Sequence, residues 1–258
     1  MEKKYELTEE TMEFNGCNLH RIKALKDFSD VKKGDLGGWV ESEDNLSQEG
    51  NCWLYGNSKV CANGLVKKNA IVKGISSIMN NSIISGNAEL YGNVVTSSRT
   101  RISGNAELNG DITITGHVTI KDDVMITGKV ALSRNVYLYS NATIESTLGN
   151  EILQIHNSGY IGTNAYITTE TDLIAIMIDG AYHRPIHLTF YKAKDKDIYT
   201  SINHHSSISL SEFEKGIRDD AEKTMFFDPS NDPFRKSLLP NILFSTICLV
   251  KDYFGIKE

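Results

Sequence analysis

The sequence predicts a mainly β protein made of short, stacked parallel strands. The first observation is an aliphatic residue at every sixth position: from Leu54 to Ile144, fifteen of sixteen such positions are Leu, Val or Ile, and Thr96 is the exception. The second is a small or β-branched residue two positions before most of them, which in a strand points to the same side. A helix with 3.6 residues per turn cannot keep a period of six on one face, so a helix is excluded.

The residues between the aliphatic positions indicate corners. Three positions before each aliphatic residue, eleven of fifteen residues are Asn or Asp, and the preceding position is often Gly, as in Gly86, Gly92 and Gly104. Gly and Asn tolerate left-handed backbone conformations that other residues avoid. Each hexad is therefore a short strand followed by a corner, and successive turns stack into a flat-sided coil.

This pattern resembles the hexapeptide-repeat family of left-handed parallel β-helices, in which three hexads form one triangular coil. Residues 19–25, 30–34, 37–41 and 45–53 also resemble the YdcK-type group of hexapeptide-repeat proteins, which includes bacterial and phage or prophage members. The resemblance covers about residues 5–145. It implies the fold and supplies no catalytic residue.

The segments outside the repeats predict a cap at each end, because a β-helix leaves an open hydrogen-bonding edge there. We expect an N-terminal β cap at residues 1–39, with a hairpin that turns at Asn15 and Gly16, and the β-helix at residues 40–173. Two extra residues enter between Leu46 and Leu54. The register is expected to slip by one residue after Ile144.

Residues 174–258 predict a small α+β cap with two helices. An apolar strand at 173–178 and a hairpin at 187–200 come first. A capping box at Ser211 and Glu214 opens the first helix, of about three turns. The second helix covers residues 237–250, with Pro240 in its first turn.

Composition and charge exclude several classes of function. The chain has 27 basic and 33 acidic residues and a net charge of −6, which argues against general nucleic-acid binding through phosphate contacts. No apolar run reaches the ~18 residues of a membrane span, and no signal peptide is read. Four cysteines without a C-x-x-C pair predict reduced, buried thiols, so we expect a cytoplasmic protein of a bacterial host cell.

Acyl transfer is the enzymatic alternative, because many hexapeptide-repeat β-helices transfer acyl groups with a histidine general base. Such enzymes usually extend a long loop from the coil, yet no insertion interrupts residues 54–144, where His117 is the one histidine. His183 and His187 are separated by Pro185, which argues against a helical metal pair. We therefore expect no catalytic residue, no metal and no cofactor, and the sequence favours a protein that is not an enzyme.

A candidate anion site follows from the spacing of three hexads. Adding 18 to Arg99 gives His117, so we expect the two at one corner with Arg101 close by, where they could hold a phosphate or carboxylate. The alternative is a solvated corner. By the same spacing Glu89 and Glu107 should stack one coil apart, where solvation or a casual cation accounts for them.

One side of the coil predicts a subunit interface, because its outward residues carry little charge. We expect a homo-oligomer, a trimer or a dimer, that packs through eight outward residues. These residues, here called the neutral strip, are Ser77, Met79, Val95, Ser97, Thr113, Thr115, Ala131 and Ser133. The alternatives are a solvated β face and a face covered by the C-terminal cap of the same chain.

Together these observations favour a non-catalytic, self-associating binding protein of phage or prophage type. A counter-defence role, in which the protein sequesters a small anionic or nucleotide ligand, fits the resemblance to phage proteins. An acyltransferase-like enzyme and a structural or scaffold protein remain the alternatives.

Overall fold

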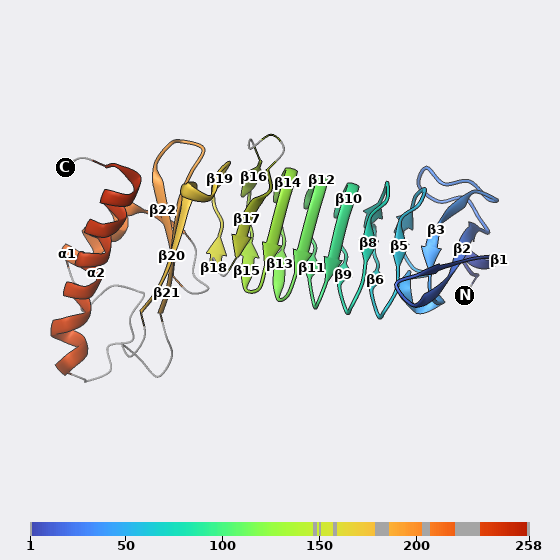
Figure 1. Ribbon diagram of the computed structural model, residues 1–258, viewed down its shortest axis with the longest axis horizontal. Coiled ribbons are helices and arrows are strands. Elements are labelled where there is room, and N and C mark those ends of the chain that lie inside the picture. The colour runs from blue at the N-terminus through green and yellow to red at the C-terminus, as the bar shows by residue number, and fades with distance from the viewer. Residues whose placement is uncertain are drawn as a thin grey trace.

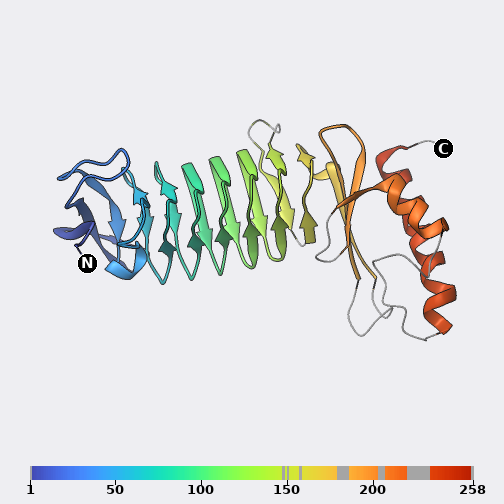
Figure 2. The ribbon, with the colours of Figure 1, turned by 180° about the vertical axis from the view of Figure 1, so that it is seen from behind.

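The computed structural model describes residues 2–146, 149, 151–156, 159–178, 186–202, 207–219 and 233–256. The chain forms an elongated rod of stacked coils, with a β cap at the N-terminal end and a sheet with two helices at the other (Figure 1). The view from behind shows the same order of coils along the rod (Figure 2). The predicted mainly β architecture is confirmed.

The regular coils repeat every three hexads, and their strands pair in parallel. Leu54 pairs with Val72, Val72 with Leu90, and Leu90 with Leu108, so each residue lies directly against the residue one coil further on. The two predicted extra residues before Leu54 are also present. Val40 pairs with Val60, which lies two positions beyond the regular step of three hexads. The hexapeptide repeat therefore forms a parallel β-helix.

Three sides make up each coil. Side 1 consists of β4 (Trp53–Leu54), β7 (Ile71–Val72), the first parts of β10 (Glu89–Ser97), β12 (Glu107–Thr115) and β14 (Met125–Ser133), β16 (Thr143–Glu145) and β19 (Tyr166–Ile167). Side 2 consists of β3 (Leu36–Val40), β5 (Lys59–Val60), β8 (Ser77–Ile78), the second parts of the same three long strands, and β17 (Leu153–His156). Side 3 consists of β6 (Leu65–Val66), β9 (Ile83–Ile84), β11 (Arg101–Ile102), β13 (Val118–Ile120), β15 (Val136–Leu138) and β18 (Gly159–Ile161).

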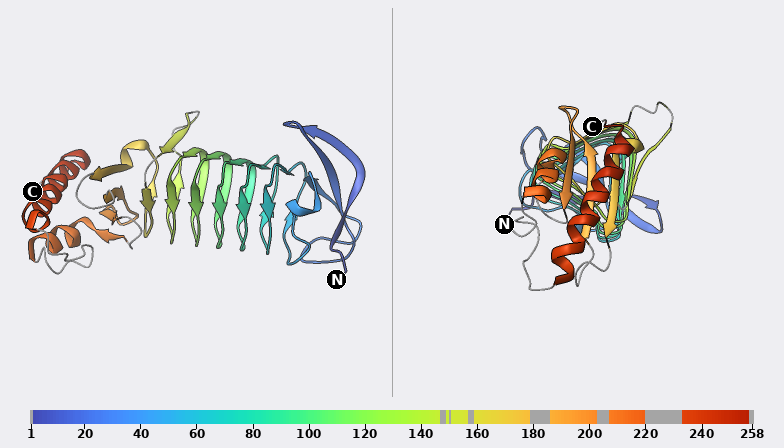
Figure 3. Two further views of the ribbon diagram at one scale, coloured as in Figure 1. Left: turned by 90° about the horizontal axis from the view of Figure 1, so that it is seen from below. Right: turned by 90° about the vertical axis from the view of Figure 1, so that its left-hand side faces the viewer.

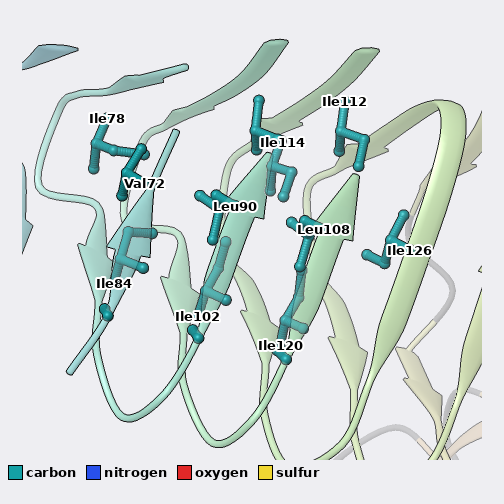
Figure 4. Packing of buried hydrophobic residues seen from close by; sticks show 14 of the residues in the cluster. Val72, Ile78, Ile84, Leu90, Ile102, Leu108, Ile112, Ile114, Ile120 and Ile126 are labelled. Atoms are coloured by element: carbon teal, nitrogen blue, oxygen red, sulfur yellow. The ribbon is translucent and has the colours of Figure 1, made fainter. Parts of the chain in front are cut away.

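The sixth-position residues fill the interior of the coil. Val72, Leu90 and Leu108 come from side 1, and with Ile84 and Ile102 from side 3 they point into one shared core (Figure 4). All of them are fully buried. Thr96 occupies an interior position as well, and its buried hydroxyl has no hydrogen-bond partner among the described residues. The interior is therefore almost purely aliphatic, and burial of its apolar surface is the main stabilising contribution to the rod.

The corners adopt the left-handed conformations that the Gly and Asn pattern predicts. Gly110 has a φ of +130°, and a Cβ atom there would lie 2.4 Å from the carbonyl oxygen of Gly128 in the next coil. Asn63 and Asn81 also have positive φ values, of 61° and 64°. Glycine is required where stacked corners touch, whereas most corner asparagines, such as Asn87 and Asn105, follow the left-handed residue and do not adopt that conformation themselves.

The N-terminal cap closes the first coil. β1 (Tyr5–Phe14) and β2 (Cys17–Ala24) form an antiparallel hairpin that turns at Asn15 and Gly16, both with positive φ as a tight hairpin requires. β2 then pairs with β3, which covers the open edge of the β-helix. A 3-10 helix, η1 (Glu43–Asn45), lies at the same end.

The C-terminal region contains β20 (Leu173–Ile178), β21 (Ile186–Lys192), β22 (Ile198–Ile202) and β23 (Ile208–Ser209), then α1 (Leu210–Asp219) and α2 (Pro233–Phe254). The four strands form an antiparallel sheet, preceded by the 3-10 helix η2 (Glu170–Asp172). The sheet and helices lie across the end of the rod (Figure 3). Phe190, Phe213 and Ile247 belong to a separate core between them. Among the described residues, no helix is long and apolar enough to cross a membrane.

Three local expectations were wrong. Ile144 pairs with Ile167, which lies five positions beyond the regular step, where a slip of one was expected. The capping box of α1 lies at Ser209 and Glu212, because the Glu212 N–H donates to the Ser209 hydroxyl across 3.2 Å. Helix α2 begins at Pro233, so Pro240 lies inside it rather than in its first turn.

Candidate functional site

Arg99 and His117 lie in adjacent coils at the corner between sides 2 and 3. Their neighbours fix this relationship, because Ser97 pairs with Thr115 on one flank and Arg101 pairs with Thr119 on the other. Both side chains are exposed. Arg99 is held in a left-handed conformation with a φ of 69°. The structure therefore brings together the two residues that the spacing of three hexads placed at one corner.

Arg101 lies on the side 3 flank of the same corner. It begins β11 and is exposed. Within the described residues, Arg99, Arg101 and His117 make no side-chain hydrogen bond or ion pair, so their donors face solvent. An anion that reached this corner would not have to displace an internal partner.

Arg134 is a further basic residue at this corner that the sequence reasoning missed. It is exposed, has a φ of 65°, and its N–H donates to the carbonyl oxygen of Thr115 across 3.0 Å. A Cβ atom on Gly116 would lie 2.9 Å from the Arg134 nitrogen, which places this arginine one coil beyond Gly116. The same spacing of three hexads could have found it. We call Arg99, Arg101, His117 and Arg134 the basic corner.

A hollow opens next to this corner, where the β-helix meets the C-terminal sheet. It has a volume of about 370 Å³ and is called the junction hollow here. Its lining residues are Asn135, Gly159, Ala175, Ile176, His187, Leu188 and Thr189. Asn135 immediately follows Arg134 and stands three hexads after His117, so this hollow begins one coil beyond His117.

Contacts between the β-helix and the C-terminal sheet fix the shape of the junction hollow. The Tyr160 N–H donates to the Thr189 hydroxyl across 3.3 Å, and a Cβ atom on Gly159 would lie only 2.8 Å from that hydroxyl. Nearby, the hydroxyls of Tyr139 and Ser207 are 3.0 Å apart. Burial raises the pKa of Tyr191, which donates to Ser207, to about 12. Tyr191 therefore stays neutral at physiological pH, and these hydrogen bonds fix the sheet on the last coil.

The corner lacks the features of an acyl-transfer base. His117 is exposed and has no carboxylate or carbonyl partner among the described residues that would orient its ring. His183, one member of the rejected metal pair, lies outside the described residues, and so do His204 and His205. Among the residues that are described, no three His, Cys, Asp or Glu side chains are grouped to hold a metal ion.

The N-terminal hairpin covers part of the neutral strip. The Asn15 side-chain amide lies 3.3 Å from the Met79 sulfur, and the Lys59 ammonium lies over the Phe14 ring, 5.2 Å from its centre. Ser77 is buried. Some of the strip is therefore covered by the same chain, at the N-terminal end rather than by the C-terminal cap. The six residues from Val95 to Ser133 are half-buried or exposed.

Comparison with known proteins supports the fold and gives one relative. No family model matches the chain. It is 36% identical over 83 residues to the uncharacterized acetyltransferase YdcK of Escherichia coli (strain K12). The chain resembles YdcK and has the hexapeptide-repeat β-helix fold. The match covers 29% of this chain and 26% of YdcK, so it spans about a quarter of that relative's length.

Proposed function

We propose that this protein binds a small anionic ligand at the basic corner and works by binding rather than by catalysis. The observation that carries the proposal is the stacking of Arg99 and His117 one coil apart, with Arg101 and Arg134 on their flanks. Neighbouring coils are about 4.8 Å apart, which lets side chains from two coils reach one phosphate group. Such local positive charge stands out on a chain with a net charge of −6.

The lining and the volume of the junction hollow favour a ligand that carries a ring beside its phosphate. The hollow is lined by apolar groups of Ala175, Ile176 and Leu188 together with polar groups of Asn135 and Thr189. Its volume of about 370 Å³ is in the range of small-molecule sites. A nucleotide fits both parts, because its phosphates would contact the arginines while its base enters the hollow. In a phage-type protein such binding would sequester a nucleotide signal of the host.

Calorimetry with adenosine triphosphate, adenosine and inorganic phosphate tests this proposal. We expect adenosine triphosphate to bind. Arg99→Ala with Arg101→Ala should lower the affinity for adenosine triphosphate by at least about tenfold, because charge-assisted hydrogen bonds are lost. Lys23→Ala with Lys33→Ala is the matched control, since it removes the same charge from exposed sites at the far end of the rod. An equal loss in both double variants would indicate a general charge effect and contradict the site.

Acyl transfer is the second candidate, and the similarity to the uncharacterized acetyltransferase YdcK favours it. On that hypothesis His117 would act as general base and acetyl-coenzyme A would supply the acyl group. Release of the coenzyme A thiol, measured with wild type and His117→Ala, separates the two functions. Turnover that His117→Ala abolishes would support the transferase, whereas nucleotide binding without turnover would support the binding protein.

A further inference from the structure

Side 1 contains a second hollow, away from the basic corner, that the anion-binding proposal does not use. It has a volume of about 490 Å³ and is lined entirely by polar and aromatic residues. We call it the side 1 hollow, and its lining residues are Asn87, Glu89, Tyr91, Asn105, Glu107 and Asn109. They come from two adjacent coils, because Glu89 pairs with Glu107 and Tyr91 with Asn109.

An asparagine ladder fixes one wall of this hollow. The Asn69 amide donates to Asn87 across 3.0 Å, Asn87 donates to Asn105 across 3.0 Å, and Asn105 donates to Asp123 across 2.8 Å. Each amide in the ladder uses one N–H and one oxygen lone pair for its neighbours. One N–H donor and one lone pair therefore remain on Asn87 and on Asn105 for another molecule.

The Lys73 ammonium contacts two tyrosine rings at the Tyr91 side of the hollow. The Lys73 ammonium lies 5.3 Å from the centre of the Tyr91 ring and 4.8 Å from that of Tyr55. Tyr55 in turn donates to Asp30, across 2.5 Å. Cation–π contacts on this scale fix the orientation of Tyr91 before any ligand arrives. The ladder and Tyr91 are thus preorganised, as a binding site requires.

Glu89 and Glu107 also line the hollow. The two carboxylates stack in neighbouring coils, and neither makes a hydrogen bond or ion pair to a described residue. They add acceptors beside the free N–H donors of the ladder. Each of these two coils therefore presents a donor next to an acceptor, and the two pairs lie about 4.8 Å apart.

We infer that the side 1 hollow binds a neutral carbohydrate. A hydroxyl group both donates and accepts, so neighbouring hydroxyls of a sugar ring satisfy an amide N–H and a carboxylate together. An anion would be repelled by the two carboxylates. A cation would be attracted by them but would face the N–H donors of Asn87 and Asn105. The mixture of donors and acceptors is the observation that favours a sugar over either ion.

Saturation-transfer NMR with D-glucose, D-galactose, N-acetyl-D-glucosamine and maltotriose tests this inference, with spermidine as the cationic probe. We expect at least one sugar to receive saturation, and its affinity to change little between about 0.1 and about 1 M salt. Glu107→Gln should lower the affinity for that sugar by about tenfold, because a charged acceptor is lost. Asp111→Asn is the matched control, since it neutralises an exposed carboxylate on β12 outside the hollow.

Asn87→Ala with Asn105→Ala removes the ladder donors and should abolish sugar binding. Since this change also removes contacts between coils, its melting curve is compared with that of Glu107→Gln, which keeps the ladder intact. The inference is overturned if none of the four sugars receives saturation, or if Glu107→Gln and Asp111→Asn have equal effects. Binding of spermidine alone, lost at high salt, would also overturn it and identify a cation site.

Discussion

Asn87 donates a side-chain hydrogen bond to Asn105 across 3.0 Å, and the two residues are one coil apart at the same corner. The bond joins coils whose backbones are already paired at Glu89 and Glu107. Each asparagine thus has two roles, since it occupies the corner and also links one coil to the next. The ladder rigidifies this edge of the rod and shapes the side 1 hollow.

Ile114→Asp should destabilise the β-helix by several kcal/mol, because Ile114 is fully buried and the new carboxylate would have no partner in an aliphatic interior. Denaturant unfolding measures the change. Thr113→Asp is the control, since Thr113 is adjacent and exposed. Equal stability of the two variants would contradict the assignment of inward and outward positions.

Gly110→Ala should destabilise the rod more than Gly56→Ala. Both glycines have positive φ, of 130° and 61°, so both substitutions introduce backbone strain of about 1 kcal/mol or more. Only at Gly110 would the Cβ approach a carbonyl oxygen at 2.4 Å, whereas at Gly56 the nearest atom is 3.7 Å away. Melting temperatures of the two variants measure the difference. Similar values would mean that neighbouring coils do not touch at this corner.

The regular coils could be predicted from sequence because their period is strict. A residue such as Leu90 needs only the spacing of three hexads to be placed against Val72 and Leu108. Between Ile144 and Ile167 that spacing breaks, because the two residues pair although they lie five positions beyond the regular step of 18. Sequence periodicity does not contain that number.

The candidate sites likewise contain residues that the repeat predicts and residues that it does not predict. Arg99 and His117 follow from the repeat, as do Glu89 and Glu107. The junction hollow could not be predicted, because it depends on where β21 docks on β18, and its Thr189 and His187 lie outside the repeat. The covering of Met79 by Asn15 likewise depends on how the hairpin bends, which no local pattern specifies.

Asp172 should contribute stability that is lost in acid. Burial would raise the pKa of this carboxyl, but hydrogen bonds from Lys192, Thr168 and Thr169 outweigh burial and lower it to about 2. The group is charged in the folded protein down to a lower pH than in the unfolded chain. Its contribution is therefore complete above about pH 4 and falls as the pH drops towards 2.

Unfolding measured between about pH 5 and about pH 2 checks this effect. Wild type should lose more stability over that window than Asp172→Asn, which has no carboxylate to protonate. If the free energy of unfolding falls equally with pH in the two proteins, Asp172 does not cause the loss of stability in acid.

Thiol reactivity should follow burial. Burial, and then a hydrogen bond to Cys17, raises the pKa of Cys61 to about 12, and burial also raises the pKa of Cys52. Cys248 is exposed on α2. Because the thiolate is the reactive form, iodoacetamide should label Cys248 first and should reach Cys52 and Cys61 only on unfolding. Peptide mass spectrometry over time reads the order, and early labelling of Cys61 would contradict the packing of the hairpin.

Self-association through the neutral strip should depend on Thr113 and Ala131, which pair across β12 and β14 and point outward from side 2. Nearer the N-terminus the hairpin already contacts Met79, so an approaching subunit would have to pack on the coils from Val95 onwards. Charge is depleted in interface cores because it must lose its water on burial. Thr113→Lys with Ala131→Glu should therefore disrupt the oligomer while the coil stays folded.

Ser85→Lys with Ser103→Glu is the matched control for this experiment. These serines are also one coil apart and half-buried, but they lie beside the buried Ile84 and Ile102 on side 3. Light scattering gives the mass of each protein, and circular dichroism shows whether it is folded. Loss of mass in the side 2 variant alone, with both variants folded, supports packing through the neutral strip. A monomeric wild type, or an unchanged mass for Thr113→Lys with Ala131→Glu, rules that packing out, because two opposite charges placed in an interface core would each lose their hydration there.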